Sequence, residues 1–491
     1  MQKIYFHSIL VSLALILVSC SQHPDVPADA KNAGTLPPIY PDYCNVTVPC
    51  NIAPLNFMLS DESFDACVAR ITTPDGNSTT YGKHRKVLIP QGDWQDILAA
   101  ACGKAIDVEV WGKKGNEWTA FKKFCIHVAK DSIDSYISYR LIEPSYIVYN
   151  EMNISQRNLT NFDETVVFNN KVACEKGKGQ CINCHSYQNY HTDNMLFHVR
   201  ATNGGTVIVN DGKLSKVDLK RENTISAGVY PAWHPTEKII AFSTNTTRQL
   251  FHTMNKNKTE VFDYASDLIL YDVLTDEVTI IAADTTRLEV FPTWSPDGKY
   301  LYYCSTLPDS TTTNIITGYE KLHYNLYRRP FNVKTRQFGE EELIYDAASR
   351  GRSVSLPRVS PDGKNILLAE SAYGCFNIWH HDADIRNLQT ITNNQQPDNN
   401  LTLLNSKGNA DSYPTWSSNG KWIMCASRRD DGNYSRVYIS YFDGSKAHKS
   451  FLLPQRDPEH NSLRLKSYNR PEFMTEPIKQ SITDFRKVVE Q

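Results

Sequence analysis

A cysteine–cysteine–histidine motif is the segment of this sequence whose residue types and spacing carry recognisable chemistry. Cys181, Cys184 and His185 form a Cys-x-x-Cys-His pentad. This spacing is that of covalent haem attachment, in which two thiols add to the vinyl groups of haem and the adjacent imidazole becomes an axial ligand of the iron. The pentad therefore predicts one covalently bound haem c.

The iron of such a haem would take a second axial ligand from a nearby side chain. If residues 195–200 form a strand, His198 and Arg200 share one face and Met195 lies on the other. Arg200 is then placed to pair with a haem propionate while His198 approaches the iron, so we rank His198 first and Met195 second. The other candidates are His191, His234 and His252.

Other uses of these cysteines remain open from the sequence. The motif is similar to that of c-type cytochromes only over the pentad, and no cytochrome fold of about 80–100 residues fits before the repeats described below. Exported thiols oxidise readily, so Cys181 and Cys184 could pair with each other or with Cys174 in a disulfide. Cys174, Cys181, Cys184 and His185 could instead bind zinc. A thiol–disulfide oxidoreductase is the fourth reading, although no thioredoxin-like βαβ pattern surrounds the motif.

The first 42 residues predict export and a lipid anchor. A short apolar run, residues 9–18, follows Lys3; it is too short for a membrane span of about 20 residues and suits a signal peptide. The run ends in Leu17-Val18-Ser19-Cys20, which resembles the bacterial lipobox. We expect a signal peptide at residues 1–19, a lipidated Cys20, and a proline-rich tether over residues 20–42. The expected location is the bacterial cell envelope, lipid-anchored, on the periplasmic side or the cell surface.

Residues 43–145 predict a small β domain. Ile106, Val108 and Val110 alternate with acidic residues, and the turn at 112–116 leads into a second apolar run, as in a β-hairpin. About 100 residues of short strands are typical of an immunoglobulin-like sandwich. Five cysteines fall in this segment, and their pairing cannot be deduced from spacing. They are Cys44, Cys50, Cys67, Cys102 and Cys125.

The second half of the chain repeats a Pro-x-Trp-Ser-Pro-Asp-Gly-Lys pattern. Copies begin at Tyr230, Phe291, Leu356 and Tyr413, and a degenerate one begins near Tyr468. Ser-Pro-Asp-Gly is a tight turn, in which proline fixes φ and glycine takes a positive φ. The apolar residues that follow read as a buried strand. Repeats of about 60 residues, each with about four strands, are typical of β-propeller blades.

These copies resemble the blades of the TolB family of periplasmic β-propellers, over about residues 190–473. The resemblance implies a ring of blades around a central channel that the family uses for protein contacts. We expect about six blades, one of them around residues 195–219 and one closed by the end of the chain. The domains expected after residue 145 are a connecting segment with the haem motif (146–192), the propeller (193–475) and a C-terminal tail (476–491).

Composition narrows the functional class. The net charge is −2 at pH 7, which gives no basic face for nucleic acid. No Gly-x-Ser-x-Gly elbow or paired-carboxylate motif occurs, so an electron-transfer or binding protein is favoured over a hydrolase. The sequence predicts a membrane-anchored binding platform for a protein or glycan of the envelope, with one haem used for electron transfer or redox sensing. The alternative is a non-redox protein- or glycan-binding propeller whose Cys-x-x-Cys is a structural disulfide.

Overall fold

The computed structural model describes residues 23–144, 147, 149–175, 177–253, 257, 259–308, 318–374, 382–389, 397 and 399–491. The expected signal peptide, residues 1–19, and the expected lipidation site Cys20 lie outside these residues. The fold is all-β, with 48% of residues in strands and 8% in helices, as the sequence predicted. In the described part of the chain, no helix is long and apolar enough to cross a membrane.

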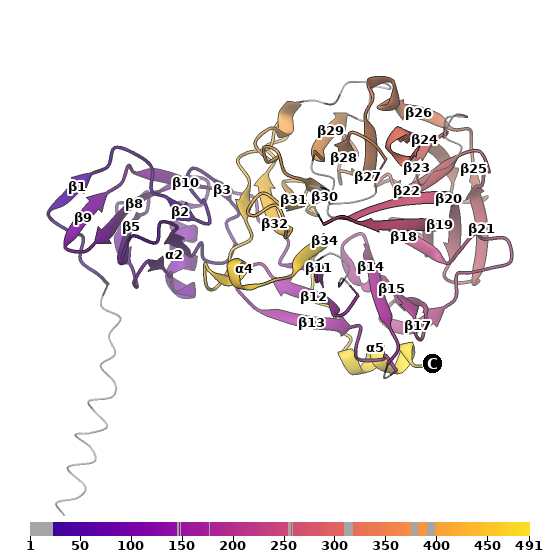
Figure 1. Ribbon diagram of the computed structural model, residues 1–491, viewed down its shortest axis with the longest axis horizontal. Helices are drawn as coiled ribbons and strands as arrows, with labels where there is room; N and C mark the ends of the chain where they lie inside the picture. Colours follow the sequence, from indigo (N-terminus) through magenta and orange to yellow (C-terminus); the bar gives the residue numbers. More distant parts are fainter. Residues whose placement is uncertain are drawn as a thin grey trace, which may run out of the picture.

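The first domain is built on a sheet with the strand order β1-β9-β8-β10-β3, in which β5 joins β8 and β6 joins β5. A smaller sheet, β2-β4-β7, and helix α2 complete it (Figure 1, indigo and purple). The immunoglobulin-like class remains a prediction. The elements are β1 (Ala30–Asn32), β2 (Ile39–Tyr40), β3 (Thr47–Val48), β4 (Phe57–Leu59), β5 (Ala66–Thr72), β6 (Ser78–Tyr81), β7 (Lys86–Val87), α2 (Gln91–Ala101), β8 (Ala105–Lys114), β9 (Glu117–Ala120) and β10 (Phe124–Val128).

The rest of the described chain forms six antiparallel sheets of three to five strands, and a parallel pairing of Ser266 with Leu288 joins the third and fourth into one nine-stranded sheet. The first three contain β11 (Tyr136–Ile142), β12 (Met152–Asn158), β13 (Glu164–Asn169) and β34 (Ser467–Met474); β14 (Gln180–Gln188), β15 (His191–Ala201), β16 (Gly205–Asn210) and β17 (Lys213–Val217); and β18 (Gly228–Trp233), β19 (Ile239–Phe251), β20 (Thr259–Asp272) and β21 (Glu277–Ala282). The last three contain β22 (Leu288–Trp294), β23 (Tyr300–Thr306), β24 (Asn325–Asn332), β25 (Gln337–Phe338) and β26 (Glu342–Tyr345); β27 (Ser353–Val359), β28 (Asn365–Ser371) and β29 (Asp384–Gln389); and β30 (Asp411–Trp416), β31 (Trp422–Ser427), β32 (Arg436–Tyr441) and β33 (Phe451–Leu452).

The six sheets form a closed, propeller-like ring. One strand of each sheet contacts the equivalent strand of the next sheet, in the order β34, β14, β18, β22, β27, β30 and back to β34. The ring closes because β34, near the end of the chain, pairs with β11, the first strand of the ring. The first sheet therefore contains both strands (Figure 1). Closure of this kind ties together segments more than 300 residues apart and leaves no large gap between sheets.

The ring begins earlier than the sequence indicated. Residues 146–192, expected as a connecting segment, contain β12, β13 and β14, and the first strand of the ring is β11. Local patterning could not reveal this, because the partner of β11 lies at the far end of the chain. The expected tail, residues 476–491, contains α5 (Ile482–Val489), whose buried face packs against β13, β16 and β17. A short helix, α4 (His460–Leu463), precedes β34.

The first domain and the ring share one hydrophobic core. Buried residues of β8 and β10 belong to the same cluster as Trp422, Met424 and Ile439 of the last sheet. The Trp422 indole also donates a hydrogen bond to the Ser132 carbonyl at 3.0 Å. The first domain is therefore fixed against the sixth sheet by apolar packing as well as by the chain connection.

Candidate functional site

The innermost strand of each sheet in the described ring carries a β-bulge at the same place. The residue at the bulge has a positive φ of 50–56°, which costs a non-glycine residue about 1–2 kcal/mol. A bulge redirects a side chain out of the regular alternation. The six bulge residues are Cys184, Tyr230, Phe291, Leu356, Tyr413 and Arg470.

Cys184, the second cysteine of the pentad, thus occupies a position of the repeat that the sequence did not reveal. Cys184-His185-Ser186-Tyr187 is equivalent to Tyr230-Pro-Ala-Trp233 in the next sheet. The copy was hidden because His185 replaces the proline and no Ser-Pro-Asp-Gly turn follows. The aromatic residue three positions after the bulge was the remaining signal. The pentad therefore lies on strand β14 and not on a helical turn.

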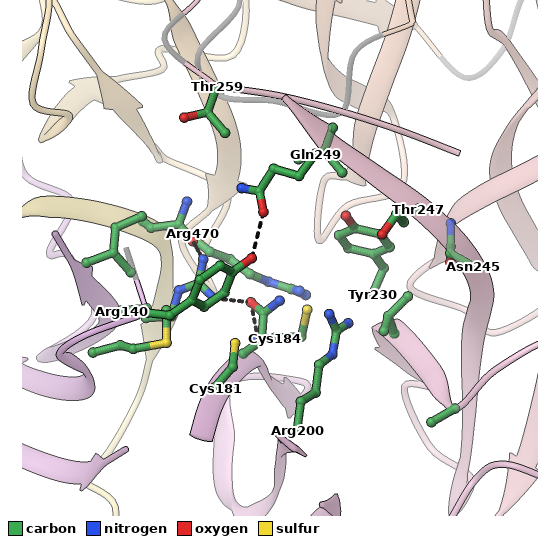
Figure 2. Close-up of a pocket in the computed structure, with 18 of the residues that line it drawn as sticks. Arg140, Cys181, Cys184, Arg200, Tyr230, Asn245, Thr247, Gln249, Thr259 and Arg470 are labelled. Atoms are coloured by element: carbon green, nitrogen blue, oxygen red, sulfur yellow. Dashed lines mark hydrogen bonds between the residues drawn. The ribbon is translucent and has the colours of Figure 1, made fainter. Parts of the chain in front are cut away.

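A cavity of about 420 Å³ opens at the centre of the ring, and we call it the axial cavity. Figure 2 shows Cys181 and Cys184 at its base, with Arg200 and Arg140 close to them, and Arg470 also lines it. The bulge residues Tyr230 and Tyr413 also line it, whereas Phe291 and Leu356 belong to a core cluster farther around the ring. Cys184 is the smallest of the six bulge side chains. Because the other five positions carry larger side chains, the small Cys184 side chain leaves space for a cavity beside it.

The axial cavity is electropositive. Arg140, Arg200 and Arg470 line it, and none of the described lining residues is an aspartate or glutamate. Arg140 is held in place by a hydrogen bond of 2.9 Å to the Asn469 side chain and one of 3.2 Å to the Ile182 carbonyl. Guanidinium groups suit carboxylates and phosphates, to which they donate two parallel hydrogen bonds. The cavity is therefore suited to a ligand with acidic groups.

Both pentad thiols are free in the structure and both line the axial cavity. Burial raises the pKa of Cys181, and the nearby Arg140 and Arg200 oppose that effect. Cys174, the third cysteine considered for a disulfide or a zinc site, donates to the Lys178 carbonyl at 2.9 Å and is not among the lining residues. Within the described ranges, no group of three or more His, Cys, Asp or Glu side chains is arranged to hold a metal ion.

The expected iron ligands do not line the cavity. His185 is fully buried, and its ring centre lies 6.1 Å from that of Tyr187. His198 is buried beside Phe242, and its Nδ1 is 2.8 Å from the Thr206 hydroxyl. Burial lowers the pKa of each imidazole to about 3, so both are neutral at pH 7.

Met195 is also turned away from the cavity, into the core cluster that includes Phe197 and Phe485. Of the predicted site residues, the structure thus brings Cys181, Cys184 and Arg200 together, whereas His185, His198 and Met195 pack between sheets. The thiols and guanidinium groups fit a covalently attached haem with acidic propionates. The imidazoles in this arrangement do not face the space that such a haem would fill.

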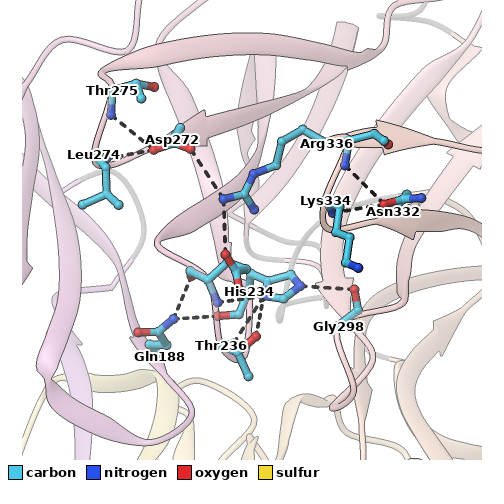
Figure 3. A network of polar contacts seen from close by, with 12 residues as sticks. Gln188, His234, Thr236, Asp272, Leu274, Thr275, Gly298, Asn332, Lys334 and Arg336 are labelled. Atoms are coloured by element: carbon cyan, nitrogen blue, oxygen red, sulfur yellow. Dashed lines mark hydrogen bonds and ion pairs between the residues drawn. The ribbon is translucent and has the colours of Figure 1, made fainter.

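Of the other candidate iron ligands, His234 and His252 have structural partners. The backbone N–H of Glu237 donates to Nδ1 of His234 at 3.0 Å, and Nε2 of His234 lies 3.1 Å from the Gly298 carbonyl in the next sheet (Figure 3). His234 is therefore a turn residue, which stabilises its own turn and connects two sheets. Nε2 of His252 is 2.6 Å from Glu260, and His191 is exposed.

A long hairpin covers the axial cavity. The outer parts of β19 and β20 supply Thr247, Gln249, Thr259 and Val261 to the lining, and Figure 2 shows Gln249 and Thr259 above the cysteines. The Tyr149 hydroxyl donates to Gln249 at 2.7 Å. We call this part of the hairpin, residues 246–251 and 259–262, the roof.

The roof is anchored on its other side by a buried carboxylate. Glu260 accepts hydrogen bonds from the hydroxyl of Tyr373, just after β28, at 2.6 Å and from that of Tyr319, between β23 and β24, at 3.0 Å. Deeper in the same strand, Asp263 accepts from Asn245, a lining residue, at 2.7 Å. Burial raises the pKa of Asp263 well above its usual value, and the Asn245 hydrogen bond opposes this.

Comparison with known proteins gives no family. No family model matches the sequence, and no curated protein matches it. Among solved structures, a chain of a nidogen/laminin complex is 7% identical, with 69% of this chain and 100% of that chain covered and a TM-score of 0.38. A Niastella koreensis GH74 enzyme is 9% identical, with 70% and 44% covered and a TM-score of 0.36. Kuenenia stuttgartiensis hydrazine synthase is 11% identical, with 54% and 64% covered and a TM-score of 0.30. Scores this low carry no argument about function.

Proposed function

We propose that the axial cavity carries one haem c, joined through thioethers to Cys181 and Cys184, and that the protein transfers electrons or senses redox state in the bacterial cell envelope. One observation carries the proposal: two free thiols at attachment spacing and three guanidinium groups line the same cavity. The ring would then be a TolB-like propeller that acts as a binding platform. Export and lipid anchoring at Cys20 belong to the same proposal and rest on the sequence pattern.

The chain's own residues have separable roles in this proposal. Cys181 and Cys184 would hold the haem through thioether bonds formed by their thiols. Arg200 and Arg470 hold acidic groups of the ligand by charge-assisted hydrogen bonds. The roof restricts access of water, which strengthens these electrostatic contacts. A bound haem c would supply one-electron chemistry.

Spectroscopy of the protein produced in a host with haem-attachment machinery tests the proposal. We expect a Soret band that persists after denaturation, together with a mass that exceeds the bare chain by one haem. Cys181→Ala combined with Cys184→Ala should abolish both signals. Cys174→Ala is the matched control and should retain both. A colourless wild-type protein with the mass of the bare polypeptide would overturn the proposal.

The lining of the axial cavity also favours a second candidate function, non-covalent binding of an anionic ligand. Three arginines without a lining carboxylate suit any ligand with two acidic groups. In this case the haem-free protein should bind a dicarboxylate or a phosphate ester in calorimetry, and Arg200→Gln should weaken binding by about tenfold. Retention of full affinity by Arg200→Gln would exclude this cavity as the binding site.

A further inference from the structure

We infer that Cys50 and Cys102 of the first domain form a disulfide bond when the protein meets a small-molecule disulfide. Cys50 lies two residues after β3, and Cys102 directly follows α2. Both are free in the structure; Cys102 is exposed and Cys50 is partly exposed. The pair is separate from the axial cavity, so the inference does not depend on the proposed haem.

Backbone pairing brings the two cysteines to the same place. The N–H of Ala129 donates to the Val48 carbonyl at 2.9 Å, which fixes the chain leading to Cys50. The N–H of Gly103 donates to the Val128 carbonyl, also at 2.9 Å, which fixes the chain leaving Cys102. Segment 128–130 therefore lies between the two positions and holds both.

The Cys50 side chain points to this same segment. Its thiol lies 3.6 Å from the Lys130 carbonyl, and Cys102 is near it. Burial and the nearby Cys102 together raise the pKa of Cys50. A disulfide requires such an approach of side chains from two backbones already close together.

The other cysteines of this domain are poor alternatives. Cys44 and Cys67 are buried, and burial raises the pKa of each to about 12. The Cys125 thiol donates to Asp107 at 3.3 Å. Thiolates are the reactive form, so an exposed thiol with a thiol neighbour reacts first.

The reaction balances as two thiol–disulfide exchanges. The Cys102 thiolate attacks one sulfur of the oxidant, such as oxidised glutathione, and one glutathione thiolate leaves. The Cys50 thiolate then attacks the Cys102 sulfur of the mixed disulfide and expels the second glutathione. The protein loses two protons and two electrons, and the oxidant becomes two thiols. The bond closes a loop that contains α2 and restrains the unfolded chain.

Peptide mapping of the full chain tests the inference. After incubation with oxidised glutathione and alkylation of the remaining thiols, a non-reducing digest should contain one cross-linked peptide that joins Cys50 to Cys102. Cys102→Ser should lose it, and Cys125→Ser, the matched control, should retain it. Wild-type protein in which both Cys50 and Cys102 are still alkylated after the oxidant would overturn the inference; this readout needs no variant to fold.

Discussion

Arg470 and Glu472 form an ion pair of 3.4 Å, yet their side chains line different cavities. Arg470 lines the axial cavity, whereas Glu472, two residues along β34, lines a second cavity of about 390 Å³ together with Trp294 and Trp416. Glu472 also pairs with Arg358 at 2.9 Å. One carboxylate therefore compensates two arginines and links the two cavities through the closing strand of the ring.

Replacement of Glu472 should destabilise the fold. In Glu472→Gln, Arg358 and Arg470 would lose their shared counter-charge, and we expect a loss of about 3 kcal/mol in the free energy of unfolding. Urea denaturation of the wild type and the variant at pH 7 measures this difference in the free energy of unfolding. The matched control is Glu476→Gln, whose ion pair with Lys479 is at the surface and should change the free energy of unfolding little.

The same variant should have a characteristic pH dependence. Burial acts to raise the pKa of Glu472, but Arg358 and Arg470 hold it below its usual value. A carboxyl with a lowered folded-state pKa stabilises the protein above its unfolded pKa of about 4.3, and that contribution is lost as pH falls through the folded value. The difference between wild type and Glu472→Gln should therefore stay nearly constant from pH 7 to about pH 5 and shrink as pH falls below about 4.3 toward the lowered folded-state pKa. A difference that does not shrink at low pH would contradict the ion-pair explanation.

The repeats could be predicted from sequence because their turns are local. Ser-Pro-Asp-Gly fixes a turn by the conformational limits of two residues, so the repeat copies that begin at Phe291 and Leu356 were visible. The pairing of β11 with β34 was not visible, because it depends on contacts between the two ends of the ring. For the same reason the sequence placed the start of the ring too late.

The candidate site was predictable in part. The spacing of Cys181 and Cys184 identified the pair, and strand alternation separated Met195 from Arg200. Sequence alone could not show that His198 packs against Phe242, because that depends on which neighbouring sheet covers this face of β15. The equivalence of Cys184 with the other bulge residues appeared only from the register of the strands.

Glu289 should make wild-type stability fall as pH rises. Burial raises its pKa to about 8; Arg287 opposes this, and Asp267, Asp284 and Glu341 add to it. A raised folded-state pKa means that the folded protein retains a proton, so the stabilisation present below the unfolded pKa of about 4.3 is lost as pH rises through about 8. Glu289→Gln should gain more than about 1 kcal/mol relative to wild type between pH 5 and pH 9 in urea denaturation. A difference that does not change with pH would show that Glu289 does not titrate in this range.

The roof should loosen when its contact with Tyr149 is removed. Tyr149→Phe deletes the 2.7 Å hydrogen bond to Gln249, a contribution of about 1 kcal/mol. Hydrogen exchange in residues 246–251 and 259–262 should accelerate by about fivefold, without change in β30 and β31. The control is Tyr434→Phe. Tyr434 lies between β31 and β32 of the sixth sheet and is far from the roof, so this variant should leave hydrogen exchange in the roof unchanged. Equal exchange in wild type and Tyr149→Phe would show that Glu260 alone anchors the roof.

The size of the residue at position 184 should decide whether the axial cavity exists. Cys184→Tyr places at this bulge the residue that Tyr230 and Tyr413 provide in other sheets, so the backbone with positive φ is compatible with it and the ring should fold. Cys184→Ala leaves the cavity open and retains Cys181 as one attachment point. After expression with haem-attachment machinery, Cys184→Ala should carry a haem through a single thioether, whereas Cys184→Tyr should carry none. Haem bound equally by the two variants would show that attachment does not use this cavity.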